Sequence, residues 1–228
     1  MLALQGQTYI PPTPGPVAKM VVFLHGYGAS GDNLLGISHY WQDILPATVF
    51  AAPNGPEPCD VNPLGYQWFG LPDFSPFNIR QGLDRCAPVV ASYLQTLMTT
   101  YQLAPQDVAL VGFSQGTIVA LEMLFLIPNL AGIIGYSGAF FPPTKCLVSP
   151  VTKVFLVHGT LDTVVPYTAL MQAEKSLSAL GINVKTHTCY NLDHSISEEG
   201  LQQGGEFLAH VLTPTDSLFK KGAVRSAL

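Results

Sequence analysis

Short apolar runs alternate with longer segments of mixed polarity along this chain. The apolar runs have the length of buried strands and fall at residues 19–24, 47–52, 107–112, 132–136 and 151–158, and a further strand is expected at residues 183–189. Between them we expect helices at residues 31–45, 81–103, 114–127, 166–180 and 195–211. Near-continuous apolar strands that alternate with helices predict an α/β fold, with a mostly parallel central sheet and helices on both faces.

The length of 228 residues suits a single domain over residues 1–228, with residues 213–228 as a loosely held tail. Residues 53–80 stand out because they are rich in proline, glycine and aromatic residues and match no long helix or strand. A loop this long inside a compact domain is usually functional. We therefore expect this segment to lie near a binding site.

Composition narrows the class of protein. The chain is 48% hydrophobic and 11% charged, and its formal charge of −5 gives no electrostatic reason to bind nucleic acid. No window of about 18 apolar residues predicts a transmembrane helix, and the first residues lack the basic region of a signal peptide. The scattered cysteines have neither metal-ligand spacing nor the density of a disulfide scaffold. We expect a cytoplasmic protein with reduced thiols and no metal site.

Residues 112–116 read GFSQG, which matches the pattern G-x-S-x-G. The motif follows an apolar strand and opens a helix, which is the context of a nucleophile elbow. Glycines flank the serine in such elbows because the turn is strained and side chains there would collide with neighbouring elements. Ser114 is therefore the candidate nucleophile. The alternative is a glycine-rich turn in which Ser114 only caps the helix.

A serine hydroxyl needs a base, and the base needs a group that orients it. In elbow-type hydrolases the chain order is serine, then acid, then histidine. Asp162 follows the strand at 151–158 and His194 follows the strand at 183–189, so both are expected at the sheet edge that carries Ser114. Asp193 is a rival for the acid, but its position next to His194 suits it poorly for reaching Nδ1. The other histidines are expected to be structural.

An oxyanion hole is the third requirement of this chemistry. One backbone N–H comes from the residue after the nucleophile, here Gln115. A second is expected from the loop after the strand at 19–24, where the sequence HGYG places Tyr27. The alternative for this loop is a tight turn that merely needs glycine.

Aromatic and apolar residues of the long loop are candidates for the substrate site. Ligand pockets are mostly apolar, so these side chains could line an acyl groove. The opposite interpretation, that they cap the core, is equally compatible with the sequence. The candidates are Trp68, Phe69 and Leu71, together with Phe140 after the strand at 132–136.

The segments FLHGYG, QWFG, GFSQG, HGTLDTVVP and DHS, in this order, resemble the phospholipase/carboxylesterase family, which includes the acyl-protein thioesterases. The resemblance runs from about residue 21 to residue 212. It implies a small α/β-hydrolase fold without a large lid domain and without a cofactor. It also implies the triad Ser114, Asp162 and His194 and the oxyanion pair Tyr27 and Gln115. Members often self-associate, so a homodimer is expected.

Two positions depart from the pattern of this family. Tyr27 stands where an aliphatic residue is usual, which leaves the backbone N–H intact. Asp193 stands where glycine is usual, which places a carboxylate beside the base and would favour the charged imidazole. Both departures bear on the substrate more than on the reaction.

The sequence thus predicts a serine hydrolase that cleaves carboxylic esters or thioesters through an acyl-enzyme. The expected substrate is a small-molecule or lipid-like acyl ester. Peptide or amide cleavage by the same triad is one alternative. A non-catalytic binding module is another, because a fold does not by itself imply a function.

Overall fold

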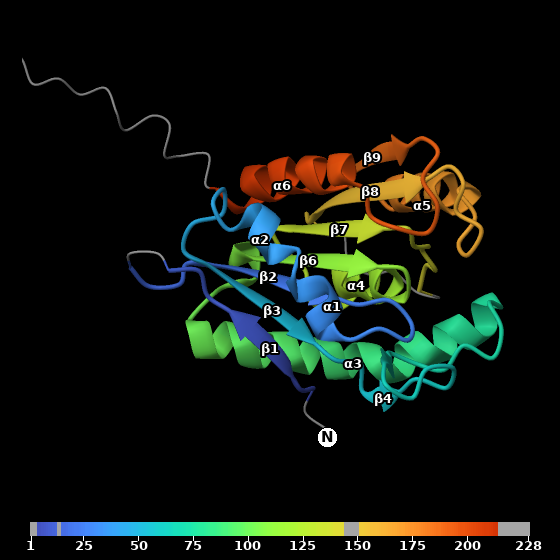
Figure 1. Ribbon diagram of the computed structural model, residues 1–228, viewed down its shortest axis with the longest axis horizontal. Coiled ribbons are helices and arrows are strands. Elements are labelled where there is room, and N and C mark those ends of the chain that lie inside the picture. Colours follow the sequence, from blue (N-terminus) through green and yellow to red (C-terminus); the bar gives the residue numbers. More distant parts are fainter. Residues whose placement is uncertain (1–3, 13–14, 144–150, 214–228) are drawn as a thin grey trace, which may run out of the picture.

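The computed structural model describes residues 4–12, 15–143 and 151–213. Its centre is a seven-stranded sheet in the order β1-β3-β2-β6-β7-β8-β9 (Figure 1). All neighbouring strands run parallel except β1, which pairs antiparallel with β3. The strands are β1 (Gly6–Tyr9), β2 (Lys19–Leu24), β3 (Thr48–Pro53), β6 (Val108–Phe113), β7 (Gly132–Tyr136), β8 (Lys153–Gly159) and β9 (Val184–Cys189).

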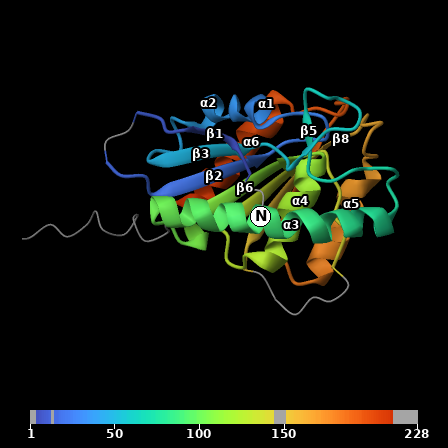
Figure 2. The same cartoon turned by 90° about the horizontal axis from the view of Figure 1, so that it is seen from below.

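Helices cover both faces of the sheet (Figure 2). One face carries α1 (Gly31–Leu35), α2 (Ser38–Trp41) and α6 (Glu198–Leu212), and the other carries α3 (Pro76–Tyr101), α4 (Gln115–Leu126) and α5 (Thr168–Ala179). Two hydrophobic core clusters fill the spaces between the sheet and these layers. Because both faces are covered, strands such as β2 and β6 are buried along almost their whole length. The predicted layers are therefore confirmed.

Three local features differ from the sequence-based expectation. Strand β1 was not predicted, because it is a largely exposed edge strand without an apolar run. The helix expected at 31–45 is two short helices, and each buries its own anchor, Leu34 in α1 and Trp41 in α2. Helix α3 begins at Pro76 rather than at residue 81, because Ser75 caps it through a hydrogen bond from the Asn78 N–H.

The long loop after β3 contains a small two-stranded ribbon, β4 (Glu57–Pro58) with β5 (Tyr66–Gln67). A 3-10 helix (Pro105–Asp107) leads into β6. No separate lid domain is present within the described ranges. The expected tail lies outside the described residues, apart from Thr213. Strand β3 runs parallel to β2, β6, β8 and β9. The loop after β3 therefore starts at the same edge of the sheet as the segments that follow those strands.

Candidate active site

Ser114 lies in a sharp turn between β6 and α4. Its backbone has φ 53° and ψ −116°, a left-handed conformation that costs a non-glycine residue of the order of 1–3 kcal/mol. The flanking glycines allow this turn: a Cβ on Gly116 would overlap the Leu24 carbonyl oxygen, and one on Gly112 would overlap the backbone of Thr117. The Ser114 N–H donates to the Tyr136 carbonyl, 2.9 Å away, and ties the turn to β7.

The loops after β8 and β9 bring Asp162 and His194 to this serine. His194 Nε2 lies 3.0 Å from Ser114 Oγ, and His194 Nδ1 lies 2.7 Å from Asp162 Oδ2. Because a carboxylate can only accept, Nδ1 carries the proton and Nε2 is left to accept from the hydroxyl. The three residues that the sequence singled out therefore form a continuous hydrogen-bonded chain with the geometry of a nucleophile, its base and an orienting acid.

The Asp162 carboxylate is surrounded by donors. Its Oδ1 accepts from the N–H groups of Val164 (2.9 Å) and Val165 (2.8 Å), and its side chain is 0% exposed. Burial favours the protonated acid, but the hydrogen bonds from His194 and from the two backbone N–H groups outweigh it. The pKa of Asp162 is therefore held below its ordinary value. These hydrogen bonds therefore favour the charged form of Asp162.

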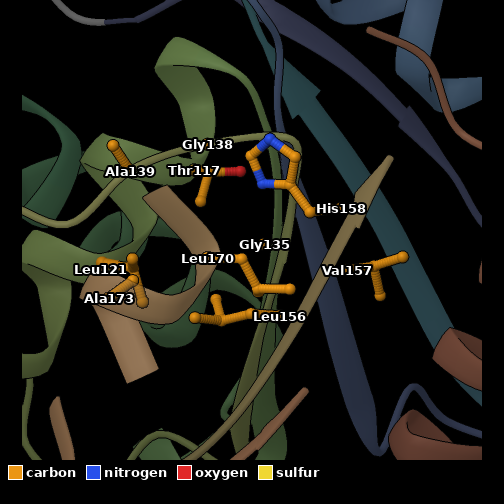
Figure 3. A pocket seen from close by; sticks show the side chains of 10 residues that line it. All are labelled: Thr117, Leu121, Gly135, Gly138, Ala139, Leu156, Val157, His158, Leu170 and Ala173. Atoms are coloured by element: carbon orange, nitrogen blue, oxygen red, sulfur yellow. The ribbon is translucent and has the colours of Figure 1, made fainter. Parts of the chain in front are cut away.

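A second imidazole supports the loop that carries the acid. His158 Nε2 lies 2.9 Å from the Val165 carbonyl and 3.3 Å from Asp162 Oδ2, so this nitrogen carries a proton and donates. Figure 3 shows the ring beside Thr117 and Gly138, at a small, mostly apolar pocket between the sheet and helices α4 and α5. His158 thus holds the loop that carries Asp162, which is a structural role of the kind expected for the histidines other than His194.

The Asp193 carboxylate is directed to a partner other than the base. Its Oδ1 accepts from Ser195 Oγ at 2.6 Å, and the Ser195 N–H donates to the Asp193 carbonyl at 2.9 Å. The imidazole of His194 instead packs against Phe113, with ring centroids 5.0 Å apart. The acid that contacts the base is therefore Asp162.

Tyr27 and Gln115 line the same pocket as Ser114, and the Gln115 N–H directly follows the Ser114 residue in the chain. Within the described part of the chain, neither N–H donates a hydrogen bond to another residue. The Tyr27 loop approaches the nucleophile closely, since a Cβ on Gly26 would lie 3.3 Å from the Cβ of Ser114. Two unpaired donors beside a nucleophile are what stabilisation of an oxyanion requires.

An apolar pocket of about 240 Å³ opens at Ser114 and His194. Leu71 lines it, as the sequence suggested. Its wall also includes the side chains of Phe74, Ile118, Val164 and Val165, besides those of Tyr27, Ala29 and Phe113. Signals for some of them were present in the sequence, because Ile118 follows Ser114 by one helical turn and the two valines stand two and three residues after Asp162.

Three of the four residues assigned to an acyl groove do not line this pocket. Trp68 and Phe69 are 0% and 1% exposed and belong to the hydrophobic core. The Phe69 ring lies against Gly82 of α3, where a Cβ would overlap it. Phe140 is partly buried and stacks on Phe125, with centroids 6.2 Å apart. For these three, the core-packing alternative is the correct one.

His25 and the cysteines lie outside the set of residues assigned to the reaction. The His25 imidazole accepts a hydrogen bond from the Gly55 N–H at 2.9 Å and so holds two loops together. Cys59, Cys86 and Cys189 are free and buried, whereas Cys146 lies outside the described residues.

No cluster of potential metal ligands occurs among the residues that the structure describes. Likewise, none of its described helices is long and apolar enough to cross a membrane.

Comparison with known proteins places this site in a family. Residues 6–212 match the Phospholipase/Carboxylesterase family. The chain belongs to this family. Its relatives include esterase YpfH of Escherichia coli, which is 26% identical over 200 residues that cover 86% of this chain and 84% of that protein. Acyl-protein thioesterase 1 of Debaryomyces hansenii is 28% identical over 224 residues, covering 88% and 94%.

A solved structure with a similar sequence identifies the fold. The crystal structure of esterase PE8 superposes with a TM-score of 0.87 at 36% identity and covers 92% of this chain and 100% of that one. The chain therefore has the α/β-hydrolase fold. Family membership alone does not establish activity, because a rice relative that is 26% identical over 202 residues (79% of this chain, 80% of that protein) is named a probable inactive carboxylesterase.

Proposed function

We propose that this protein is a serine hydrolase of acyl esters or thioesters, with Ser114 as nucleophile, His194 as base and Asp162 as the orienting acid. The observation that carries the proposal is the hydrogen-bonded chain from Ser114 Oγ through His194 to Asp162, in which Ser114 and His194 line an apolar pocket. An inactive relative would be expected to lose part of such a chain. Here each member is present and directed at the next.

The reaction follows from the geometry. Ser114 Oγ attacks the acyl carbonyl while its proton passes to His194 Nε2. The carbonyl oxygen becomes negatively charged and accepts from the N–H groups of Gln115 and Tyr27. His194 then returns the proton to the departing alcohol or thiol, which leaves an acyl ester on Ser114. A water molecule repeats the sequence, with His194 as its base, and releases the carboxylic acid.

The acyl group is the part of the substrate that fits the pocket. Its wall is formed by aliphatic and aromatic side chains, and the polar groups concentrate around Ser114. Such a pocket favours an apolar acyl chain over a charged one. A lipid-like or small acyl ester is therefore the expected substrate.

Ser114→Ala tests this proposal. The wild-type protein should react with a fluorophosphonate probe and hydrolyse p-nitrophenyl butyrate and an acyl thioester. The variant should keep its circular dichroism spectrum, lose labelling, and lose turnover by about 10⁴-fold or more. Wild-type turnover in Ser114→Ala would refute the assignment. Faster cleavage of a p-nitroanilide than of the matching ester would favour an amidase instead.

A further inference from the structure

We propose that Trp68 is a positioning residue that sets the spacing between the two oxyanion donors; this inference rests on the proposed function. Trp68 is completely buried, and it makes hydrogen bonds to both segments that supply those donors. Its indole Nε1–H donates to the His25 carbonyl at 2.8 Å, and its backbone N–H donates to Gln115 Oε1 at 3.0 Å. One residue thereby links the loop after β2 to the start of α4.

The link to Gln115 is doubled. The Gln115 side chain is 2% exposed, and while its Oε1 accepts from Trp68 its Nε2 donates to the Phe69 carbonyl at 2.7 Å. An amide that both donates and accepts along one backbone segment imitates a strand neighbour, so it cannot rotate without losing both bonds. Because side chain and backbone share one Cα, this clamp also restrains the Gln115 N–H.

The link to Tyr27 acts through the backbone. The His25 carbonyl that accepts the indole N–H belongs to the peptide unit that leads into Gly26 and Tyr27. The indole also packs on the His25 ring, with centroids 5.1 Å apart, and the His25 ring is held in turn by the Gly55 N–H. The Tyr27 N–H shares its peptide unit with the Gly26 carbonyl, which lies 2.8 Å from His25 Nδ1 and accepts from the Ala29 N–H at 3.1 Å. Trp68 therefore helps to restrain the direction of the Tyr27 N–H through the carbonyl and the ring of His25.

The functional consequence follows from how oxyanion holes work. Two donors must converge on the oxygen of the transition state at about 2.7–3.1 Å, and a displacement of about 1 Å can cost a factor of 10² in rate. Trp68 does not line the pocket, and its hydrogen bonds go to Gln115 and His25 rather than to the triad. It should therefore affect stabilisation of the oxyanion without changing the base.

The test uses the two tryptophans of the chain as a matched pair. Trp41 is also buried, and its Nε1–H also donates to a backbone carbonyl, that of Leu201 at 2.9 Å, but in the core cluster on the other face of the sheet. Trp68→Phe and Trp41→Phe each remove one buried indole hydrogen bond. We expect comparable losses of thermal stability in both.

Only Trp68→Phe should change catalysis. On p-nitrophenyl butyrate its kcat should fall by about 10- to 100-fold, with KM and the acid limb of the pH–rate profile unchanged. Its affinity for butylboronic acid, which forms an anionic tetrahedral adduct with the serine oxygen, should fall by a similar factor. A residue with only a structural role would not lower the affinity for this adduct selectively.

Several outcomes would overturn the inference. They are an unchanged kcat in Trp68→Phe, an equal loss in Trp41→Phe, and a shifted acid limb, which would indicate a disturbed base. If circular dichroism shows that Trp68→Phe is unfolded, Gln115→Met decides, because it keeps the backbone N–H but loses both side-chain hydrogen bonds and should show the same selective loss. Wild-type activity in Ser114→Ala would instead remove the proposed function, and the inference with it.

Discussion

Phe74 offers a direct test of which part of the substrate occupies the apolar pocket. Its side chain lines the pocket and is 60% exposed, so an acyl chain that enters should cover the ring. Full burial of a phenylalanine contributes roughly 1.5–3 kcal/mol, and covering the exposed 60% would contribute up to about 0.9–1.8 kcal/mol. That range corresponds to about a 5- to 20-fold effect on kcat/KM.

The assay is a series of p-nitrophenyl esters from acetate to hexanoate. In the wild type, kcat/KM should rise by up to about fourfold per methylene until the pocket is full, since each buried CH₂ contributes about 0.8 kcal/mol. Phe74→Ala should lower the hexanoate value by about 5- to 20-fold and leave acetate nearly unchanged. Phe77→Ala is the matched control, because Phe77 is 69% exposed and does not line the pocket.

Three results would refute this reasoning about the pocket. A flat wild-type profile would mean that the acyl chain lies elsewhere. An equal loss on acetate and hexanoate in Phe74→Ala would mean that the ring supports the site rather than the chain. A similar loss in Phe77→Ala would show that the effect comes from the loop as a whole.

Two further predictions concern the acid and its neighbour. Asp162→Asn should lower kcat by about 10³-fold or more, because the amide no longer supports the imidazolium. Since folding lowers the pKa of Asp162, its charge stabilises the fold above the unfolded value of ~3.9 and less below it. Urea unfolding should therefore show the stability gap between wild type and Asp162→Asn shrinking as the pH falls below about 4; a constant gap would contradict this. Asp193→Gly should leave the acid limb of kcat/KM in place, because the Asp193 carboxylate binds Ser195; a limb that moves to lower pH would show that this carboxylate stabilises the charged base.

The proximity of Ser114, Asp162 and His194 could be predicted from the sequence because it depends on chain order and strand ends. Ser114, Asp162 and His194 each follow a strand of a parallel sheet, and the carboxyl ends of such strands meet at one edge. The layers were predictable for a similar reason, since central strands such as β2 and β6 are covered on both faces and are apolar along almost their whole length. Strand β1 escaped prediction because an exposed edge strand carries no such signal.

The substrate side was predicted less well because composition does not reveal the direction of a side chain. The loop after β3 contains many aromatic residues, and the sequence offers no regular period from which to assign faces. Trp68 and Phe69 point into the core, while Leu71 and Phe74, shortly after them, line the pocket. The Gln115 side chain forms hydrogen bonds with Trp68 and Phe69, which lie far from it in the chain. A contact between such distant segments leaves no local pattern in the sequence.

Phe74 and Trp68 lie in the same loop but should affect catalysis in different ways. Phe74 lines the pocket, so its loss should change the slope across a series of acyl chains and spare the shortest ester. Trp68 does not line the pocket but makes hydrogen bonds to the segments that hold the oxyanion donors, and every ester passes through the same oxyanion. Its loss should therefore lower kcat by the same factor on acetate and on hexanoate, and the slope should stay as in the wild type. If Trp68→Phe changed the slope, the indole would be shaping the pocket rather than holding the donors.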